Sequence, residues 1–296
     1  MGRIVRRAVP RTLGRTRRVL SALMCPPTHY TVCYSINPWM KTDVRVDRGA
    51  ALRQWMTLVA ALEAGGVEIA LIKQAPSLPD MVFTSNAGLL YGNRLLLSRF
   101  GPSERRGEEP LFARWFVEHG FRIDVLDETF EGAGDAFVFH GLLLAGYGQR
   151  STLRGIRAVA EGLGLPLLPL RLTDPRFFHL DTCLSILDSR TILWYPDAFD
   201  GDARGALRSL DVQLIAVTEG EALQFGCNAL TDGQNVYSTT DSLRLSQLLD
   251  DVGFTLRPIP LGEFLKGGGG VRCLALPLVE VGADEDDLDQ ALASTA

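Results

Sequence analysis

A recurring pattern of paired short strands constrains this fold most. Two apolar runs flank the turn Gly92-Asn93, and two more flank His140-Gly141; such turn pairs between β-rich runs indicate hairpins. Apolar residues at helical spacing, each followed by a β-rich run, predict helices over 50–64, 111–119 and 153–163 and strands over 68–73, 121–125 and 165–170. The expected unit is therefore hairpin, helix and strand, repeating about every 50 to 60 residues. A plain doubly wound sheet would not need the hairpins.

The two ends of the chain differ in charge from its middle. Residues 1–24 hold seven arginines and no acid, whereas residues 279–296 hold six acids and no base. Such segments are typical of unstructured extensions, although an Arg-rich start also fits a transit peptide. With 296 residues and 46% hydrophobic content, we expect one α/β domain over 25–278 between a basic extension and an acidic tail.

Composition excludes several classes of protein. The formal net charge of −5 gives no field for holding nucleic acid or an anionic membrane, so a small-molecule partner is expected. Five cysteines without a CxxC pair indicate neither a disulfide framework nor structural zinc, which favours the reducing cytoplasm. Apolar stretches fall far short of the ~20 residues that span a bilayer. A homo-oligomer is compatible with the sequence.

Three polar motifs interrupt the apolar runs. Asp80 and Asn86 lie six residues apart, so both would point to one face of a strand; a turn after Pro79 is the alternative. Glu131-Gly132-Ala133-Gly134-Asp135 places two acids around small residues, or is an ordinary loop. His179 and Asp181 would share a strand face, where the histidine is a candidate general base or a structural residue.

A fourth motif ends the apolar part of the chain. Gly267 to Gly270 lead into Val271-Arg272-Cys273, which would present a thiol at the start of a strand, beside unobstructed backbone amides. A glycine linker before a buried cysteine is the alternative. Arg99 and Arg150 are candidates for binding a carboxylate, or are solvated surface arginines. Together, thiol, histidine and acids are the parts of a site for covalent catalysis.

The ordered set PDMVF…N, EGAGD, HLDT and GGGGVRC resembles the guanidine-modifying (pentein) superfamily, which includes dimethylarginine dimethylaminohydrolases, arginine deiminases, arginine dihydrolases and amidinotransferases. The resemblance covers roughly residues 25–278. It implies a five-bladed, pseudosymmetric α/β propeller of ββαβ-type units with one site in its central channel, and a single catalytic domain. This agrees with the repeating unit described above.

The resemblance also implies roles for individual residues. Cys273 would be the nucleophile, His179 the acid and base, and Glu131 the acid that positions the histidine. One set would bind the guanidinium: Asp80, Asn86 and Asp181. Another would bind the amino-acid carboxylate: Arg99 and Arg150. The motif around Glu131 has one residue more than the common EGGD pattern, so Asp135 stays an alternative partner for the histidine. No metal or organic cofactor is implied.

The resemblance fits two branches of the superfamily, which differ in substrate. Asn37, in Tyr34 to Met40, and Asn86 resemble the arginine dihydrolase branch, in which both asparagines contact the guanidinium. Short chains of this layout are also similar to dimethylarginine dimethylaminohydrolases. Our first hypothesis is a dimethylargininase that releases citrulline and dimethylamine from a guanidino amino acid. An arginine dihydrolase or deiminase, an amidinotransferase, and a non-catalytic binding protein on the same scaffold are the alternatives.

Overall fold

The computed structural model describes residues 18–281, and this part of the chain forms five three-stranded sheets. The first comprises β1 (Arg18–Met24), β2 (Glu68–Leu71) and β15 (Ala275–Val281). The second comprises β3 (Gly88–Tyr91), β4 (Arg94–Leu97) and β5 (Arg122–Val125), and the third β6 (Ala136–Phe139), β7 (Leu142–Tyr147) and β8 (Leu167–Arg171). The fourth comprises β9 (Leu184–Ile186), β10 (Thr191–Trp194) and β11 (Gln213–Ala216), and the fifth β12 (Leu230–Thr231), β13 (Asn235–Ser238) and β14 (Thr255–Pro258).

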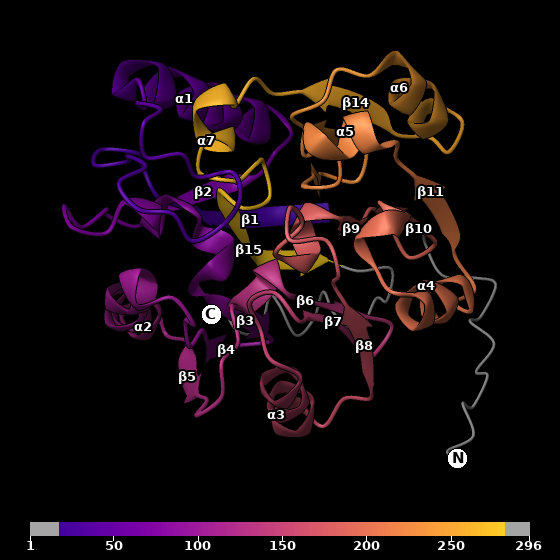
Figure 1. Cartoon of the computed structure of the whole chain (residues 1–296), viewed down its shortest axis with the longest axis horizontal. Helices are drawn as coiled ribbons and strands as arrows, with labels where there is room; N and C mark the ends of the chain where they lie inside the picture. Colours follow the sequence, from indigo (N-terminus) through magenta and orange to yellow (C-terminus); the bar gives the residue numbers. More distant parts are fainter. Residues whose placement is uncertain (1–17, 282–296) are drawn as a thin grey trace.

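All five sheets share one topology. The middle strand pairs antiparallel with one neighbour and parallel with the other. A helix connects each parallel pair: α1 (Arg48–Ala64), α2 (Glu109–Glu118), α3 (Leu153–Leu163), α4 (Gly201–Arg208) and α6 (Leu243–Asp250). Short helices α5 (Glu219–Leu223) and α7 (Gly262–Leu265) lie in the connections. The sheets follow one another around a common centre, with the five longer helices at the periphery (Figure 1), so the expected five-bladed α/β propeller is confirmed.

The first sheet closes the ring from both ends of the described chain. β1 is its middle strand, so that Ala22 pairs with Pro277 of β15 on one side and with Ile69 of β2 on the other. The expected domain boundary after residue 24 is therefore wrong, since residues 18–24 supply a central strand. The boundary at residue 278 is also too early, because β15 continues to Val281. The rest of the two expected extensions, residues 1–17 and 282–296, lies outside the described residues.

Local chemistry explains where the helices begin and end. The Asp47 side chain accepts a hydrogen bond from the backbone N–H of Ala50 at the start of α1, and Thr152 does the same for Gly155 in α3; such caps satisfy otherwise unpaired N–H groups. Gly164 ends α3 with a φ of 67°, a left-handed conformation that favours glycine. The expected buried strand at 68–73 is shorter, and its ends are exposed because β2 lies at an edge of its sheet.

Two segments that alternate like strands are instead short turns. Asp80 and Asn86 lie in successive 3-10 helices, Pro79–Val82 and Thr84–Ala87, and Asp181 lies in a third, Leu180–Thr182. The predicted strand faces for the Asp80–Asn86 and His179–Asp181 pairs are therefore wrong. These segments are buried throughout, and their polar and apolar residues alike face the interior, so an even spacing of polar residues carries no information about a strand face.

In each sheet a turn precedes the outer strand that pairs antiparallel with the middle strand, and these five turns, before β3, β6, β9, β12 and β15, are hydrogen-bonded into a ring. Asn86 Nδ2 donates to the carbonyl of Glu131 (3.1 Å), and Leu180 N donates to Asp135 Oδ1 (3.1 Å). Asn228 Nδ2 donates to the carbonyl of Asp181 (3.0 Å), and Cys273 N donates to Asn228 Oδ1 (3.1 Å). Ser85 N donates to the carbonyl of Cys273 (3.1 Å) and completes the ring.

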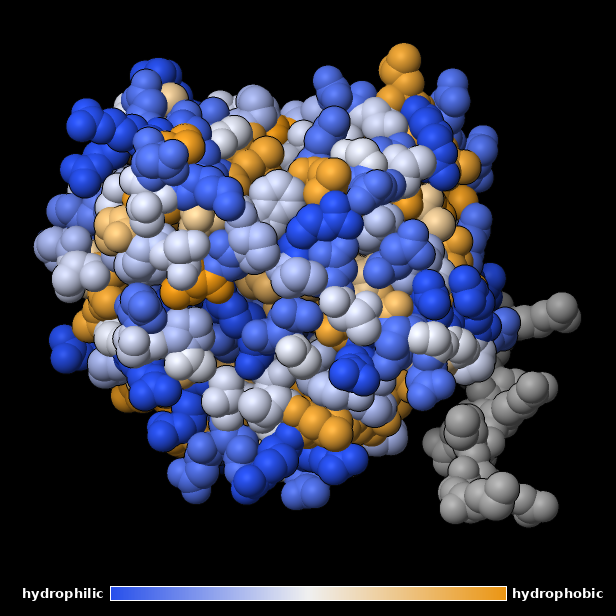
Figure 2. Space-filling model, viewed as in Figure 1, coloured by the Kyte–Doolittle hydropathy of each residue, from blue (hydrophilic) through white to orange (hydrophobic). Residues whose placement is uncertain are grey.

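The surface of residues 18–281 carries both hydrophobic and polar residues. On the face shown in Figure 2, hydrophobic residues form small patches separated by polar ones. No helix within residues 18–281 is long and apolar enough to cross a membrane.

Candidate active site

A narrow cavity opens beside the ring of turns. Its lining includes the three residue types that the sequence singled out, a thiol, a histidine and an acid, together with amides and arginines. The lining residues are Ile36, Asn37, Met40, Asp80, Phe83, Asn86, Arg105, Arg150, Phe178, His179, Gly267, Gly268 and Cys273. The fold therefore brings together residues from six separate connections: β1–α1, β2–β3, β4–α2, β7–α3, β8–β9 and β14–β15.

Cys273 lies in a turn two residues before β15, not at the start of a strand as expected. The glycines before it are buried and are no flexible linker. Gly268 has a φ of 82°, which only glycine adopts freely. A Cβ on Gly269 would collide with the ring of Phe83 and lie 3.2 Å from Cys273 Cβ. The glycine run thus allows a close approach of backbone to aromatic rings behind the thiol.

Asp181 lies against the thiol. Its two carboxylate oxygens are 3.6 and 3.8 Å from Cys273 Sγ, and Ser85 Oγ donates to Oδ2 at 3.3 Å. Burial raises the pKa of Asp181 to about 7, against the opposing charge of Arg272. Burial, and then the nearby Asp181 carboxylate, raise the pKa of the Cys273 thiol well above its usual value. Without a bound cation, the site therefore favours the protonated thiol.

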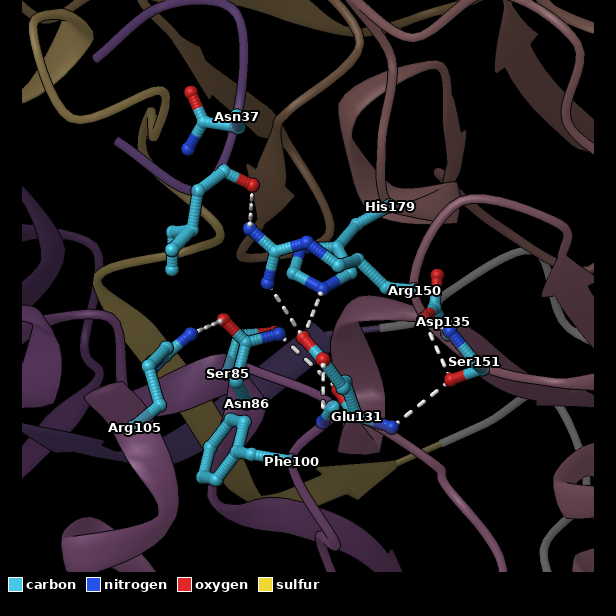
Figure 3. Close-up of polar contacts among 12 residues, drawn as sticks. Asn37, Ser85, Asn86, Phe100, Arg105, Glu131, Asp135, Arg150, Ser151 and His179 are labelled. Carbon is cyan, nitrogen blue, oxygen red and sulfur yellow. Dashed lines mark hydrogen bonds and ion pairs between the residues drawn. The ribbon is translucent and has the colours of Figure 1, made fainter. Parts of the chain in front are cut away.

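His179 points at Glu131, with 2.8 Å between His179 Nε2 and Glu131 Oε2. Arg150 Nη1 donates to the same oxygen at 2.9 Å, and Figure 3 shows both side chains converging on this carboxylate. Burial raises the pKa of Glu131, but the hydrogen bond from His179 and the charge of Arg150 outweigh it and hold that pKa at about 2. Glu131 is thus an ionised acceptor that orients the imidazole.

Asp135, the alternative partner of the histidine, is used elsewhere. Its carboxylate accepts from Ser151 Oγ (2.6 Å) and from the backbone N–H of Leu180 (3.1 Å). Ser151 Oγ in turn accepts from Glu131 N at 2.9 Å, as Figure 3 shows. The geometry therefore makes Glu131 the partner of His179 and leaves Asp135 to hold the turns around them.

Asp80 and Asn86 face the cavity from the second sheet's connection. Burial raises the pKa of Asp80, opposed by the charge of Arg105, and Asp80 Oδ1 has no hydrogen-bond partner within residues 18–281. An unpaired buried acceptor is costly, so this oxygen favours a cationic ligand. Asn86 Oδ1 accepts from Arg105 Nη1 at 2.9 Å.

Arg105 is a cavity residue that sequence reasoning missed. It is held by Glu108 through two hydrogen bonds of 2.7 and 3.0 Å and lies over the Phe100 ring at 4.4 Å. The sequence Ser-Glu-Arg-Arg-Gly-Glu around it resembles a solvated loop. The one available signal was the spacing of Arg105 and Glu108, which suits an ion pair over one turn.

The structure does not bring every predicted residue to the cavity. Asn37 lines it and donates from Nδ2 to the carbonyl of Gly267 at 3.0 Å. Arg150 lines it, but its Nη2 donates to the carbonyl of Ile36 at 2.9 Å. Arg99 is exposed, and among residues 18–281 it is not part of the lining. The expectation that Arg99 binds a carboxylate is therefore wrong, because its backbone pairs with Phe130 and directs the side chain outward.

Comparison with known proteins agrees with this geometry. The family described as N,N dimethylarginine dimethylhydrolase, eukaryotic, matches residues 35–280. The chain belongs to this family. The dimethylarginine dimethylaminohydrolase of Mycobacterium tuberculosis is 39% identical over 264 residues, which is 89% of this chain and 87% of that protein. The predicted resemblance to the guanidine-modifying superfamily is thus confirmed.

Relatives of this dimethylarginine hydrolase family include larger proteins. The bifunctional arginine dihydrolase/ornithine cyclodeaminase ArgZ of Synechocystis is 43% identical over 265 residues, 87% of this chain. This chain covers only 37% of ArgZ and 38% of its Nostoc counterpart AgrE. The substrate-bound crystal structure of the ArgZ N-terminal domain has a TM-score of 0.85 and 41% identity, covering 88% of this chain and 98% of that domain.

Proposed function

We propose that this protein is a cysteine-dependent hydrolase of the guanidinium C–N bond of arginine or a methylated arginine. The observation that carries the proposal is a cavity lined by Cys273, His179 and Asp80, with a second carboxylate and an ionised acid directly behind them. Asp181 lies against the thiol and Glu131 against the histidine. Two carboxylates suit one planar cation. A thiol beside them suits attack on its central carbon.

The proposed reaction follows from these positions. The guanidinium binds between Asp80 and Asp181, and its charge offsets the carboxylate that keeps Cys273 protonated, so that the thiol loses its proton to His179. The thiolate forms a bond to the central carbon, and His179 returns the proton to the departing amine. A covalent thiouronium remains. His179 then takes a proton from water and the water oxygen bonds to the same carbon. The C–S bond breaks as the proton of the new hydroxyl passes to the sulfur, and His179 releases its proton to solvent.

Arginine is the substrate that the cavity favours. Asn86 lines it with an amide oxygen that accepts from Arg105 and has a second lone pair for a substrate N–H group, which a dimethylated nitrogen lacks. Asn37 also lines it, but its amide is held by the backbone of Trp39, Met40 and Gly267. The likeness to the substrate-bound ArgZ domain, at 41% identity, supports the same choice. We therefore propose arginine dihydrolysis. The first round of attack and hydrolysis gives citrulline and one ammonia, and a second round at the same carbon gives ornithine, a second ammonia and carbon dioxide. Hydrolysis of dimethylarginine is the second candidate, favoured by the family match over residues 35–280.

Product analysis by mass spectrometry tests both candidates. Purified protein is incubated separately with arginine and with asymmetric dimethylarginine, with Cys273→Ala as the control. Ornithine and ammonia from arginine support the dihydrolase, whereas citrulline and dimethylamine from the methylated substrate support the second candidate. Both products should disappear in Cys273→Ala. Equal inertness of the wild type and Cys273→Ala on both substrates contradicts the proposal.

We further propose that the reaction runs in the cytoplasm. All five cysteines are free thiols, and four of them are buried. Proteins of oxidising compartments tend to use their cysteines in disulfides, so this pattern supports a reducing compartment.

A further inference from the structure

The ring of turns has a fifth member to which the sequence assigned no role. The site residues proposed above come from the turns before β15, β3, β6 and β9. The turn before β12 carries Asn228, which lies two residues before its strand, as Asn86 does before β3 and Cys273 before β15. Pseudosymmetry thus places a polar side chain at the centre from the fifth sheet as well.

The orientation of the Asn228 amide is fixed by its partners. The side chain is fully buried; Oδ1 accepts from the backbone N–H of Cys273 at 3.1 Å, and Nδ2 donates to the carbonyl of Asp181 at 3.0 Å. A backbone N–H can only donate and a carbonyl can only accept, so the amide cannot be turned over.

The second hydrogen of Asn228 Nδ2 is then available to the nucleophile. Nδ2 lies 3.1 Å from Cys273 Sγ. An amide NH₂ group can donate but not accept, so this contact favours the thiolate over the thiol. Asp181 has the opposite preference, because a carboxylate accepts from the thiol and repels the thiolate. The sulfur therefore lies between Asn228, which stabilises the thiolate, and Asp181, which stabilises the thiol.

The backbone around Asn228 is shaped for this contact. Phe225, whose carbonyl accepts from Asn228 N at 2.9 Å, has a φ of 57°, an unusual conformation for a bulky residue that tends to occur at functional sites. A Cβ on Gly270 would lie 2.9 Å from Asn228 Oδ1. Both the turn of Asn228 and the glycine run of the nucleophile thus make room for the amide.

We propose that Asn228 is a catalytic residue that donates a hydrogen bond to the attacking sulfur while its other end fixes the backbone of the nucleophile. The assignment deepens the proposed function and rests on it. No bond to Asn228 forms or breaks: the amide holds the thiolate until its electron pair forms the S–C bond, and the thiol proton leaves with the amine by way of His179.

Several charged groups share the surroundings of the sulfur and must be considered in any pH dependence. They are Asp80, Arg105, Arg150 and His179 in the cavity lining, Asp181 in contact with the sulfur, Glu131 behind the histidine, and Arg272 beside Asp181. A variant that leaves all of these unchanged and adds no charge, such as Asn228→Ser, isolates the contribution of Asn228.

Alkylation of Cys273 by iodoacetamide between pH 6 and 10, followed by peptide mass spectrometry, tests the proposal without substrate. Asn228→Asp keeps the acceptor for Cys273 N–H and removes both donated hydrogen bonds. Asn228→Ser is a second variant with no added charge. Asn93→Asp makes the same chemical change at an exposed turn between β3 and β4 and is the matched control.

We expect Cys273 in both Asn228 variants to be alkylated at least about 10-fold more slowly at pH 8, with the rise in rate displaced to higher pH. The kcat for the substrate should fall by a similar factor while KM stays within about twofold. Wild-type alkylation rates and pH dependence in folded variants would overturn the proposal. If Asn228→Asp shows no cooperative unfolding and is therefore not folded, the alkylation rate of Asn228→Ser decides whether the proposal holds. A wild type inert on arginine and dimethylarginine would instead contradict the proposed function and leave the alkylation result standing.

Discussion

Glu131 is the residue on which most of the polar contacts of the site depend. Its carboxylate accepts from His179, from Arg150 and, through Oε1, from the backbone N–H of Gly101 at 3.2 Å. A fully buried carboxylate is stable only with such partners. They hold its pKa near 2, although burial alone would raise it. Glu131 therefore stays ionised throughout the neutral range and keeps the imidazole in one orientation.

Glu131→Gln should lower kcat by about 100-fold or more, because the neutral amide no longer stabilises a protonated His179. The substrate KM should change little, since Glu131 is not part of the cavity lining in residues 18–281. Steady-state kinetics of product release would measure both. Glu128→Gln, at a half-buried glutamate paired with the exposed Arg154, is the control and should retain wild-type kcat. Wild-type kcat in Glu131→Gln would contradict the assigned role.

The pH dependence of stability follows from Asp181. Its folded-state pKa of about 7 exceeds the ordinary value of about 3.9 for an aspartate, so the folded protein binds more protons than the unfolded chain between these values. The protonated Asp181 therefore contributes to the free energy of unfolding in full below about pH 4, and this contribution is lost as the pH rises to about 7. Glu108, with a pKa raised to about 7 by burial, acts in the same direction.

We expect the free energy of unfolding of the ligand-free protein to fall between pH 5 and pH 8, and to fall less in Asp181→Asn. Urea unfolding at the two pH values measures this difference directly. Asp241→Asn, at an exposed aspartate, is a control that should match the wild type. An unchanged pH slope in Asp181→Asn would show that Asp181 is already ionised in the ligand-free protein.

At the scale of elements, the sequence predicted the parts with strong periodicity. The helix at 153–163 agrees with α3, and the hairpins around Gly92 and His140 agree with the structure within a few residues. The strand faces considered for 79–87 and 180–182 are wrong, whereas the alternative of a turn after Pro79 is correct. These segments are buried on all sides, so an even spacing of polar residues does not define a strand face there. The errors thus fall on the elements that carry the site.

The site residues that could be predicted from the sequence are those that belong to local motifs. Cys273, His179 and Glu131 belong to motifs that a family resemblance could carry over. Arg105 and Asn228 do not, because a buried ion pair and a pseudosymmetric position become visible only when distant turns meet in space. Arg99 was predicted as a free cation and through the family resemblance, but it lies beyond the end of β4 in a single bridge to Phe130, with its side chain exposed.

Gly269→Ala tests the role of the glycine run as a packing element. The new methyl group would overlap the Phe83 ring and press on Cys273, so we expect a loss of about 1–3 kcal/mol in the free energy of unfolding together with reduced kcat. Gly205→Ala on α4, where a Cβ has no neighbour within 4 Å, should instead be neutral or stabilise the protein by up to about 1 kcal/mol. Urea titration and steady-state kinetics would compare the two. Equal stability of both variants would contradict this role.

At the scale of the whole molecule, the site exists only if the ring of sheets is closed. The nucleophile lies just before β15, and β15 is held by β1 from the other end of the described chain. The Cys273 turn is hydrogen-bonded to the turns of Asn228 and Ser85, and the strand that follows it is held by β1. A break at the β1–β15 pairing would therefore remove the support of this turn from its own sheet. Folding and activity are therefore expected to be lost together.

Ala22→Asp tests this dependence. Ala22 is fully buried in β1 between β2 and β15, and an unpaired carboxylate there should cost about 3 kcal/mol or more in the free energy of unfolding. Activity should fall with the folded fraction, because the ring opens at the sheet that holds Cys273. Leu243→Asp, at a residue of α6 that is 81% exposed, should change stability by no more than about 0.5 kcal/mol. Urea unfolding followed by tryptophan fluorescence, with kcat measured on the same samples, makes the comparison. A wild-type midpoint in Ala22→Asp would mean that the β1–β15 closure does not hold the fold together.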